Sequence, residues 1–259
     1  MADERIKDKT MIKNYRLTIK YDGTRYNGWQ RQGNTPDTIQ GKIEAVLAVM
    51  CKEQVELAGS GRTDAGVHAL EQTANFKADI DMKPEEVKSY LNKYLPEDIA
   101  VVTADTVSER FHSRLNAKEK TYLYRIYTGK DKPVFDRRYL FVPGEEDKEL
   151  NIENMKQAAD YLIGEHDFKS FCGNKSMKKS TVRRIHEIRF EKKTDELDIF
   201  FTGNGFLQNM VRIITGTLLD VGKGCIKPDD MQKILLAKDR SSASGMAPAK
   251  GLTLVEVRY

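Results

Sequence analysis

A loop of ten residues at positions 59–68, Gly-Ser-Gly-Arg-Thr-Asp-Ala-Gly-Val-His, constrains the fold of this chain more than any other stretch. Three glycines within eight residues allow the backbone to take positive φ and to approach other groups closely. An apolar run at 55–58 precedes the loop, and a strand-like segment at 72–76 follows it. The pattern therefore predicts a strand, a tight glycine-rich loop and a second strand.

The loop carries groups that are capable of chemistry. Asp64 is its carboxylate, Arg62 lies two residues before it, and His68 lies four residues after it. Loops that a sheet holds in place are frequent positions for binding and catalytic groups. The alternative is structural: Asp64 forms an Asx turn with its own backbone, while Arg62 is a solvated charge and His68 an ordinary partly buried histidine. The loop alone leaves both interpretations open.

Size and composition are those of an ordinary globular protein in water. A chain of 259 residues is long for one core, so we expect one elaborate domain or two smaller ones. The apolar runs are too short to cross a bilayer, and the first nine residues are mostly charged, without the apolar stretch of a signal peptide. We therefore expect a cytoplasmic protein without membrane contact. The three cysteines lack the spacing of a zinc site, so we expect free thiols and no metal.

Hydrophobic periodicity predicts the elements of the first half. Residues 15–21 alternate apolar and polar side chains, as a half-buried strand does. Apolar residues at helical spacing predict helices at 39–50 and 84–95, and 99–102 is a short strand. Together with the strands on either side of the loop, these elements give the order β-α-β-β-α-β of a ferredoxin-like fold.

The second half, which begins after a hinge at 111–114, repeats the alternation of strands and helices. Strands are predicted at 120–127, 182–192, 197–202 and 252–259, and helices at 152–163, 207–221 and 229–237. The predicted organisation is thus two similar halves, residues 12–112 and 113–259. Arg212 falls among apolar residues of the helix at 207–221, so its charge needs a partner if it points inward.

Positive charge is concentrated in one segment of the second half. The net charge of +4 favours anionic partners weakly. Five cations nevertheless fall within ten residues: Lys175, Lys178, Lys179, Arg183 and Arg184. Such a run forms either a solvated loop or a set of contacts to phosphates. Trp29, which lies among Asn, Gln and Arg residues, either packs a loop against the core or stacks on a base, and we favour packing.

Seven short blocks, taken together, resemble the TruA-type tRNA pseudouridine synthases. Each block is modest support, but they occur in the family's order from about residue 15 to the last residue. They lie at residues 22–24, 28–30, 61–68, 120–122, 166–168, 206–212 and 249–252. The charged N-terminal lead-in has no counterpart among them.

The resemblance implies a cofactor-free isomerase that converts uridine to pseudouridine in the anticodon stem-loop of tRNA, at the neighbouring positions 38–40. The N-glycosidic bond breaks, the uracil turns over, and a bond forms between C5 and C1′. The implied α+β fold, the pseudouridine synthase fold, sets two ferredoxin-like (RRM-like) halves about a shared, largely antiparallel sheet with a central cleft. The implied partners are tRNA and a second copy of the chain, because members of the family are homodimers.

The resemblance also assigns catalytic roles, and chemistry explains why these residue types suit them. Asp64 is the nucleophile, because an ionised carboxylate stabilises or traps the positive charge that develops at C1′. Arg212 keeps that carboxylate ionised and directs it. Tyr122 stacks on the uracil, and its hydroxyl assists removal of the C5 proton. Leu252 packs on the other side of the base. Whether Asp64 attacks C1′ or C6, or removes a proton from the sugar, stays open.

The remaining assignments concern RNA binding. The target nucleotide leaves its stack before it reacts, and Arg62 is placed to fill the vacated space and to hold a phosphate. Lys178 and Lys179 are expected to contact the tRNA backbone. His68 and His166 also match positions of the family, but we expect both to be structural.

Two other classes of function remain open on sequence grounds. A tRNA-binding chaperone would use the same basic surface and aromatic residues without needing Asp64. A nucleoside or glycoside hydrolase would use a carboxylate at an anomeric carbon in a similar way. A hydrolase built on Ser60, His68 and Asp64 is disfavoured, because three residues of one short loop do not readily align as a relay.

Overall fold

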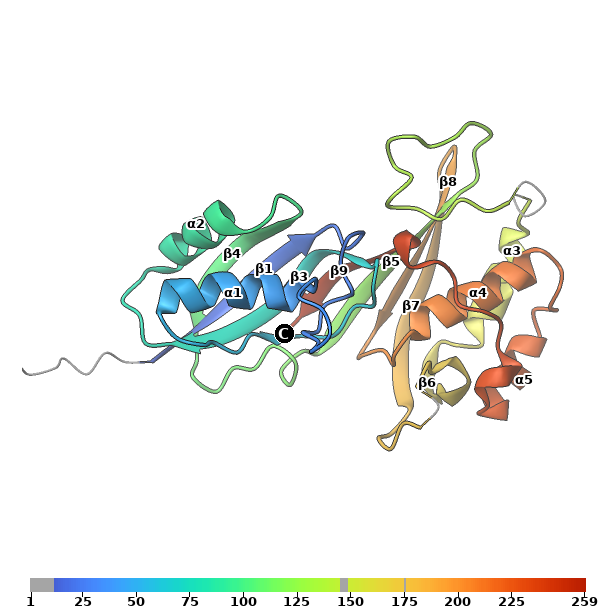
Figure 1. Ribbon diagram of the computed structural model, residues 1–259. Coiled ribbons are helices and arrows are strands. Elements are labelled where there is room, and N and C mark those ends of the chain that lie inside the picture. Colours follow the sequence, from blue (N-terminus) through green and yellow to red (C-terminus); the bar gives the residue numbers. More distant parts are fainter. Residues whose placement is uncertain (1–11, 145–148, 175) are drawn as a thin grey trace, which may run out of the picture.

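The computed structural model describes residues 12–144, 149–174 and 176–259. Within these ranges one sheet of nine strands runs the length of the molecule (Figure 1). Its strands are β1 (Lys13–Tyr21), β2 (Ala58–Gly59), β3 (His68–Ala78), β4 (Ile99–Val107), β5 (Glu119–Tyr127), β6 (Gly164–Asp167), β7 (Val182–Lys192), β8 (Glu196–Gly203) and β9 (Leu252–Arg258). The predicted lead-in at residues 1–9 and Lys175 lie outside the described residues.

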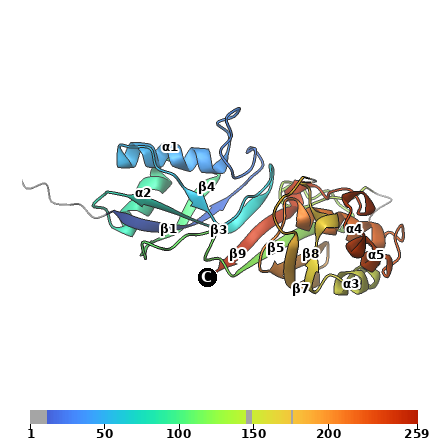
Figure 2. The same cartoon turned by 90° about the horizontal axis from the view of Figure 1, so that it is seen from below.

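The helices belong to two groups. In the first half these are α1 (Ile39–Cys51) and α2 (Pro84–Tyr94). In the second half they are α3 (Ile152–Asp160), α4 (Met210–Gly222) and α5 (Asp230–Ala237), with short 3-10 turns at Lys169–Phe171, Arg240–Ser242 and Ala249–Gly251. Figures 1 and 2 show α1 and α2 over the strands of one end of the sheet, and α3, α4 and α5 gathered at the other end. None of the helices within the described ranges is long and apolar enough to cross a membrane.

The last strand, β9, joins the two ends of the sheet. The strand order is β4-β1-β3-β9-β5-β8-β7-β6, with β2 paired to β3. β9 pairs in parallel with the start of β3, where His68 lies opposite Thr253, and antiparallel with β5. The other pairings are antiparallel, so the prediction of a mixed α+β chain with a large, mostly antiparallel sheet is confirmed.

Alternation along the strands produces the core. On β1, Tyr15, Leu17 and Ile19 are fully buried, while the intervening residues point to the other face of the sheet. α1 contributes Ile43 and Leu47 to the same core, and its first turn is capped by Thr38, whose hydroxyl accepts a hydrogen bond from the Gly41 amide at 3.2 Å. Burial of these aliphatic and aromatic side chains fixes the sheet on which the loop at 60–67 is mounted.

The structure corrects several predicted boundaries. The strand before the glycine-rich loop is reduced to Ala58–Gly59, and the strand after it begins earlier than predicted, so His68 belongs to β3. The helix predicted from residue 207 starts at Met210, because Asn209 adopts a left-handed conformation with φ of 60° that breaks the helical path. The helix predicted to end at residue 163 ends at Asp160. β6 was not predicted, because four residues are too few for a clear alternation.

Candidate active site

The loop that carries Asp64 is anchored at its base by buried polar groups. The Ser60 amide donates to the Thr73 carbonyl at 2.7 Å, and the Ser60 hydroxyl donates to Oε1 of Gln72 at 2.6 Å. Nε2 of Gln72 in turn donates to the Gly61 carbonyl at 3.0 Å. Because Ser60 and Gln72 are fully buried, these hydrogen bonds hold the start of the loop against β3.

Lys120, near the beginning of β5, also holds the start of the loop in place. Its Nζ donates to the Ser60 carbonyl at 2.5 Å, and a Cβ placed on Gly61 would lie 2.6 Å from that nitrogen. Glycine is therefore needed at position 61 for the lysine to approach. Burial, with a smaller effect from the charge of Arg114, lowers the pKa of Lys120 to about 8.

The other side of the loop packs on the segment at 22–30. The Trp29 amide donates to the Thr63 carbonyl at 3.0 Å. Gly28 has a φ of 90°, and a Cβ there would lie 2.6 Å from the same carbonyl. The Trp29 side chain is 2% exposed and packs against Gly59, which confirms the prediction that this residue packs in the core and does not stack on a base.

Helix α4 supplies the partners of Asp64. Nη1 of Arg212 lies 3.3 Å from Oδ2 of Asp64, although 148 residues separate the two in sequence. The Arg212 side chain is 14% exposed, and its Nε donates to the Ala247 carbonyl at 2.9 Å, so the guanidinium is fixed on both sides. The Asp64 side chain is 29% exposed. The carboxylate is thus bound by α4 instead of forming an Asx turn in its own loop.

Asn209 is a site residue that the sequence analysis missed. Its Nδ2 donates to Oδ2 of Asp64 at 2.5 Å, from the position just before α4. The missed signal was an asparagine directly before a buried helix, since asparagine is among the few residues other than glycine that adopt positive φ readily. Asn209 and Arg212 both donate to Oδ2, and among the described residues no donor reaches Oδ1.

Two apolar residues predicted to contact the base lie on the neighbouring strands β5 and β9. Tyr122 is 7% exposed and meets Phe206 edge to face, with ring centroids 5.2 Å apart. Burial, followed by the charges of Tyr21 and Asp64, raises the pKa of Tyr122 well above its usual range, so its hydroxyl stays protonated. Leu252 is 5% exposed and lies opposite Tyr124 in the β5–β9 pair, on the same face as Tyr122.

The two histidines have local structural contacts. Nδ1 of the buried His68 accepts a hydrogen bond from the Gly23 amide at 3.0 Å, so Nε2 carries the proton and donates to the Arg138 carbonyl at 3.0 Å. Burial lowers the pKa of His68, so it is neutral. Nε2 of His166 lies 2.8 Å from the Ile163 carbonyl. These contacts agree with the expected structural roles.

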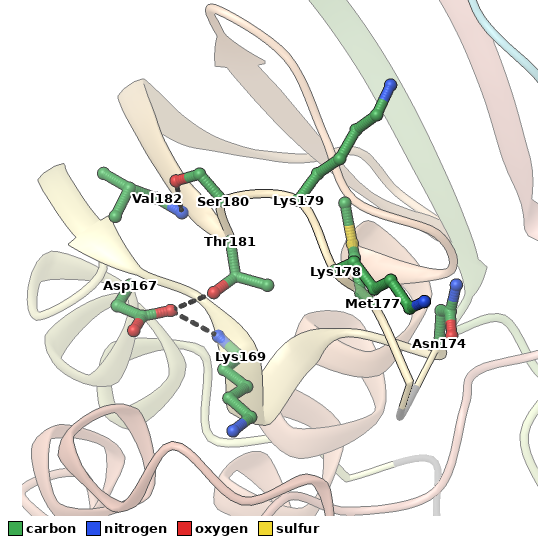
Figure 3. A pocket seen from close by; sticks show the side chains of 9 residues that line it. All are labelled: Asp167, Lys169, Asn174, Met177, Lys178, Lys179, Ser180, Thr181 and Val182. Atoms are coloured by element: carbon green, nitrogen blue, oxygen red, sulfur yellow. Dashed lines mark hydrogen bonds between the residues drawn. The ribbon is translucent and has the colours of Figure 1, made fainter.

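The cations assigned to RNA binding are on the surface. Arg62 is exposed, and its Nε donates to Oε1 of Gln30 at 3.0 Å. Lys178 and Lys179 are exposed on the loop between the turn at Lys169–Phe171 and β7, at the rim of a hollow of about 360 Å³ (Figure 3). This loop begins beside the site, because the Gly173 amide donates to the Gln208 carbonyl at 2.8 Å.

The arrangement suits one kind of chemistry. A partly exposed carboxylate is held by a guanidinium and an amide through one of its oxygens, on a loop whose base is fixed by buried hydrogen bonds. Such a group can attack, or stabilise, an electron-poor carbon that reaches it from solvent. An apolar wall that includes a protonated tyrosine hydroxyl lies on the adjacent strands.

Comparisons with known proteins identify the family. A family model described as "tRNA pseudouridine synthase" matches residues 17–116 and 158–259. The chain is 49% identical over 249 residues to "tRNA pseudouridine synthase A" of Bacillus sp. (strain KSM-64), and the match covers 96% of this chain and 100% of the relative. It is 48% identical to "tRNA pseudouridine synthase A 1" of Clostridium tetani and 46% identical to "tRNA pseudouridine synthase A 2" of Bacillus cereus, with the same coverage.

The family model and the curated relatives all match both ends of the sheet, including the positions of Asp64 and Arg212. The matches to the curated relatives also include the position of Tyr122, which lies between the two segments of the family model. The chain therefore belongs to the tRNA pseudouridine synthase family, isomerases that convert uridine to pseudouridine.

Proposed function

We propose that this protein converts uridine to pseudouridine in the anticodon stem-loop of tRNA, at positions 38–40, with Asp64 as nucleophile and without a cofactor. The observation that carries the proposal is the ion pair of Asp64 with Arg212 at 3.3 Å, in which the carboxylate stays 29% exposed. An isomerisation that moves no electrons to or from an external acceptor needs no redox cofactor, and the ionised carboxylate supplies the stabilisation that C1′ requires.

The bonds exchange as follows. The N1–C1′ bond breaks, and its electron pair leaves with the uracil. Asp64 stabilises the electron-poor C1′ or forms an ester with it. The uracil turns over inside the site, C5 attacks C1′, and Asp64 is released. The proton lost from C5 is balanced by the proton gained at N1, so the product is an isomer of the substrate.

Tyr122 and Leu252 form the surface on which the base turns. The two side chains lie on one face of adjacent strands, and both are nearly buried, so an inserted uracil would exclude water there. The raised pKa of Tyr122 keeps its phenol neutral. We therefore assign its hydroxyl to passing on the C5 proton as part of a hydrogen-bonded chain, not to acting as a phenolate base.

Binding of tRNA is assigned to exposed cations. Arg62 lies two residues before Asp64 in the sequence and would enter the space that the flipped nucleotide leaves. Lys178 and Lys179 would contact the phosphates of the same stem, on the loop that starts at Gly173.

The proposed architecture is two ferredoxin-like halves, residues 12–112 and 113–259, working as a homodimer that grips tRNA in the cleft between the halves. Strand order supports the first part of this proposal. If the four main strands of each half are numbered along the chain, both halves have the spatial order 4-1-3-2. This order is β4-β1-β3-β2 in the first half and β9-β5-β8-β7 in the second half, where β6 is added at the edge. Light scattering of the purified protein, alone and with tRNA, tests the dimer.

The test uses tRNA labelled with tritium at uracil C5. We expect tritium to enter water while the base stays attached to ribose, and the release to disappear when the uridines at positions 38–40 are replaced by cytidine. Free uracil would indicate a hydrolase, and binding without release would indicate a chaperone. Release that persists after those replacements would contradict the assigned positions. Activity that is lost on dialysis against a chelator and restored by a metal would contradict the cofactor-free reaction.

A further inference from the structure

Asn209 is a polar residue beside Asp64 to which the proposed reaction gives no part. We propose that Asn209 is a positioning residue, whose amide fixes Asp64 by Oδ2 and so selects Oδ1 as the oxygen that reacts. This inference rests on the proposed role of Asp64 as nucleophile. It is carried by the backbone of Asn209, by the oxygen that it shares with Arg212, and by its contact with Gly173.

The backbone of Asn209 is unusual for a residue at the start of a helix. An asparagine in this position normally has an extended conformation, and its side chain accepts a hydrogen bond from an amide of the first turn. Asn209 instead has φ of 60° and ψ of 6°, and it makes no such side-chain cap. Left-handed conformations are costly for residues with a Cβ and recur at functional sites. The conformation gives up the cap and leaves the amide free to reach Asp64.

Asn209 and Arg212 act on the same oxygen from the start of α4. Asn209 directly precedes the helix and Arg212 lies in its first turn, so both side chains reach Asp64 from this end of the helix. Nδ2 of Asn209 and Nη1 of Arg212 lie 2.5 and 3.3 Å from Oδ2 of Asp64. Two donors that converge on one position restrain the rotation of the carboxylate more than a single donor does, so one of its two equivalent oxygens always faces away from them. Oδ1, which receives no hydrogen bond from the described part of the chain, is then the more nucleophilic oxygen.

Gly173 leaves room for the Asn209 amide in this orientation. A Cβ added at Gly173 would overlap Oδ1 of Asn209, so a larger residue at position 173 would displace the amide. The Gly173 amide also donates to the carbonyl of Gln208, the residue before Asn209, at 2.8 Å, which keeps the two segments together. The nitrogen side of the Asn209 amide faces Asp64. In this orientation the asparagine gives the carboxylate a donor in place of a second acceptor.

A pH–rate profile separates positioning from a general structural role. Among the described residues, Arg212 from α4 pairs with Asp64, and Tyr122 from β5 feels the charge of Asp64 and has a raised pKa, so it stays neutral near neutral pH. A hydrogen-bond donor to a carboxylate favours its ionised form, so removing the donor raises the pKa of the acid. Loss of the Asn209 amide should therefore move the acid limb of the profile upward by about one pH unit.

The experiment compares Asn209→Gly with wild type. Glycine adopts the left-handed conformation without strain, so the variant loses the amide and keeps the backbone. We expect kcat to fall by about tenfold to a hundredfold, since the lost bond is made to a charged group, while the Kd for tRNA stays within about twofold. Asn209→Asp should lose more, because it replaces a donor by a second negative charge. Asn204→Gly is the matched control, because the Asn204 side chain contacts the Arg184 backbone amide instead of Asp64.

The kcat, the acid limb and the tRNA affinity of Asn209→Gly decide the proposal. It is overturned if Asn209→Gly keeps wild-type kcat and acid limb, or if only tRNA affinity changes. If Asn209→Gly does not fold, Gly173→Ala takes its place, because the added Cβ displaces the amide without removing it and should shift the acid limb in the same direction. Asp64→Asn, measured alongside, separates the two claims. An active Asp64→Asn refutes the nucleophile itself, whereas an inactive one beside an unaffected Asn209→Gly refutes only the positioning role.

Discussion

Asp64 and Asp198 both lie beside cationic partners, yet the two carboxylates differ in their exposure to solvent. Asp64 pairs with Arg212 and keeps 29% of its side chain exposed. Asp198, on β8, pairs with Lys193 at 2.5 Å and keeps 2%. Both pairs look alike in composition, so the presence of an acid beside a cation does not by itself mark a catalytic site. Access for a substrate makes the difference.

We call Asp198, Glu196, Lys193 and Arg125 the closed cluster, and Asp64 with Arg212 and Asn209 the open cluster. The closed cluster shows how full burial changes the pKa of an acid. Burial, with the neighbouring Glu196 adding to it, raises the pKa of Asp198 to about 6. Burial also opposes ionisation of Glu196, but hydrogen bonds from Arg125 and Asp198 outweigh it and lower the pKa of Glu196 to about 2. Oδ1 of Asp198 is buried without a donor among the described residues, and a proton shared with Glu196 would satisfy it. The closed cluster therefore holds a proton up to a pH of about 6, while the open one keeps an oxygen available.

Arg212→Leu is expected to separate the two clusters most strongly. Removing the guanidinium leaves Asp64 without its charged partner, so the rate should fall by about 100- to 1,000-fold, with a smaller loss of stability because Asp64 can be hydrated. Arg125→Leu, the matched change in the closed cluster, should lower stability and leave the rate near wild type. Single-turnover pseudouridine formation and urea unfolding measure both. Equal rates for Arg212→Leu and Arg125→Leu would contradict the distinction between the open and the closed cluster.

Tyr122→Phe tests the surroundings of the open carboxylate. The ring and its contact with Phe206 remain, so tRNA binding should hold, but loss of the hydroxyl should lower kcat by about 100-fold. Tyr124→Phe is the control, because Tyr124 donates to the Pro248 carbonyl in the core. It should cost about 1 kcal/mol of stability and little rate. A Tyr122→Phe enzyme with normal kcat would show that the hydroxyl takes no part.

Asp198→Asn tests the raised pKa of Asp198 in the closed cluster through the pH dependence of stability. The pKa of Asp198 is about 6 in the folded state against 3.8 for the free side chain, so the folded state holds the proton more tightly. Raising the pH from about 4 to 6 therefore destabilises the wild type through this group. Asparagine mimics the protonated acid. The variant should gain stability relative to wild type between pH 4.5 and 7.5, by at most about 3 kcal/mol. The midpoints of urea unfolding of both proteins, measured at the two ends of this pH range, test the prediction. A loss of stability of the variant relative to wild type at the higher pH would contradict it.

The smallest effect is expected from charge at the rim of the open site. Replacing Lys178 and Lys179 by glutamate should weaken tRNA binding and flatten its dependence on salt, with kcat preserved at saturating tRNA. Lys233→Glu on α5, a lysine that is 79% exposed, is the control. Titrations at several salt concentrations give the slopes. An unchanged slope in the double variant would place this loop outside the tRNA footprint.

The sequence was informative wherever a residue's role follows from local pattern. Alternation along β1 and β5 predicted which side chains are buried, and a charged residue inside the apolar α4 predicted that Arg212 needs a partner. The partner itself, Asp64, came from the resemblance to a family and not from spacing, because 148 residues separate the pair.

Contacts that depend on backbone conformation were not predictable in this way. Asn209 reaches Asp64 because its φ is positive, and residue type alone does not reveal that conformation. Gly28 was identified only as part of the block at 28–30, whereas its lack of a Cβ lets Thr63, far along the chain, come close. The burial of Asp198 was not predicted either, because alternation along β8 puts it on the face opposite to the buried Leu197 and Ile199.

The most direct measurement is tritium release by Asp64→Asn beside wild type and Asp198→Asn, with tRNA affinity measured for each. Asparagine keeps the shape of the side chain and removes its charge, so we predict that Asp64→Asn loses activity by about 10,000-fold or more and still binds tRNA. Asp198→Asn should stay active. Near-normal release by Asp64→Asn would contradict the claim that this carboxylate carries the reaction.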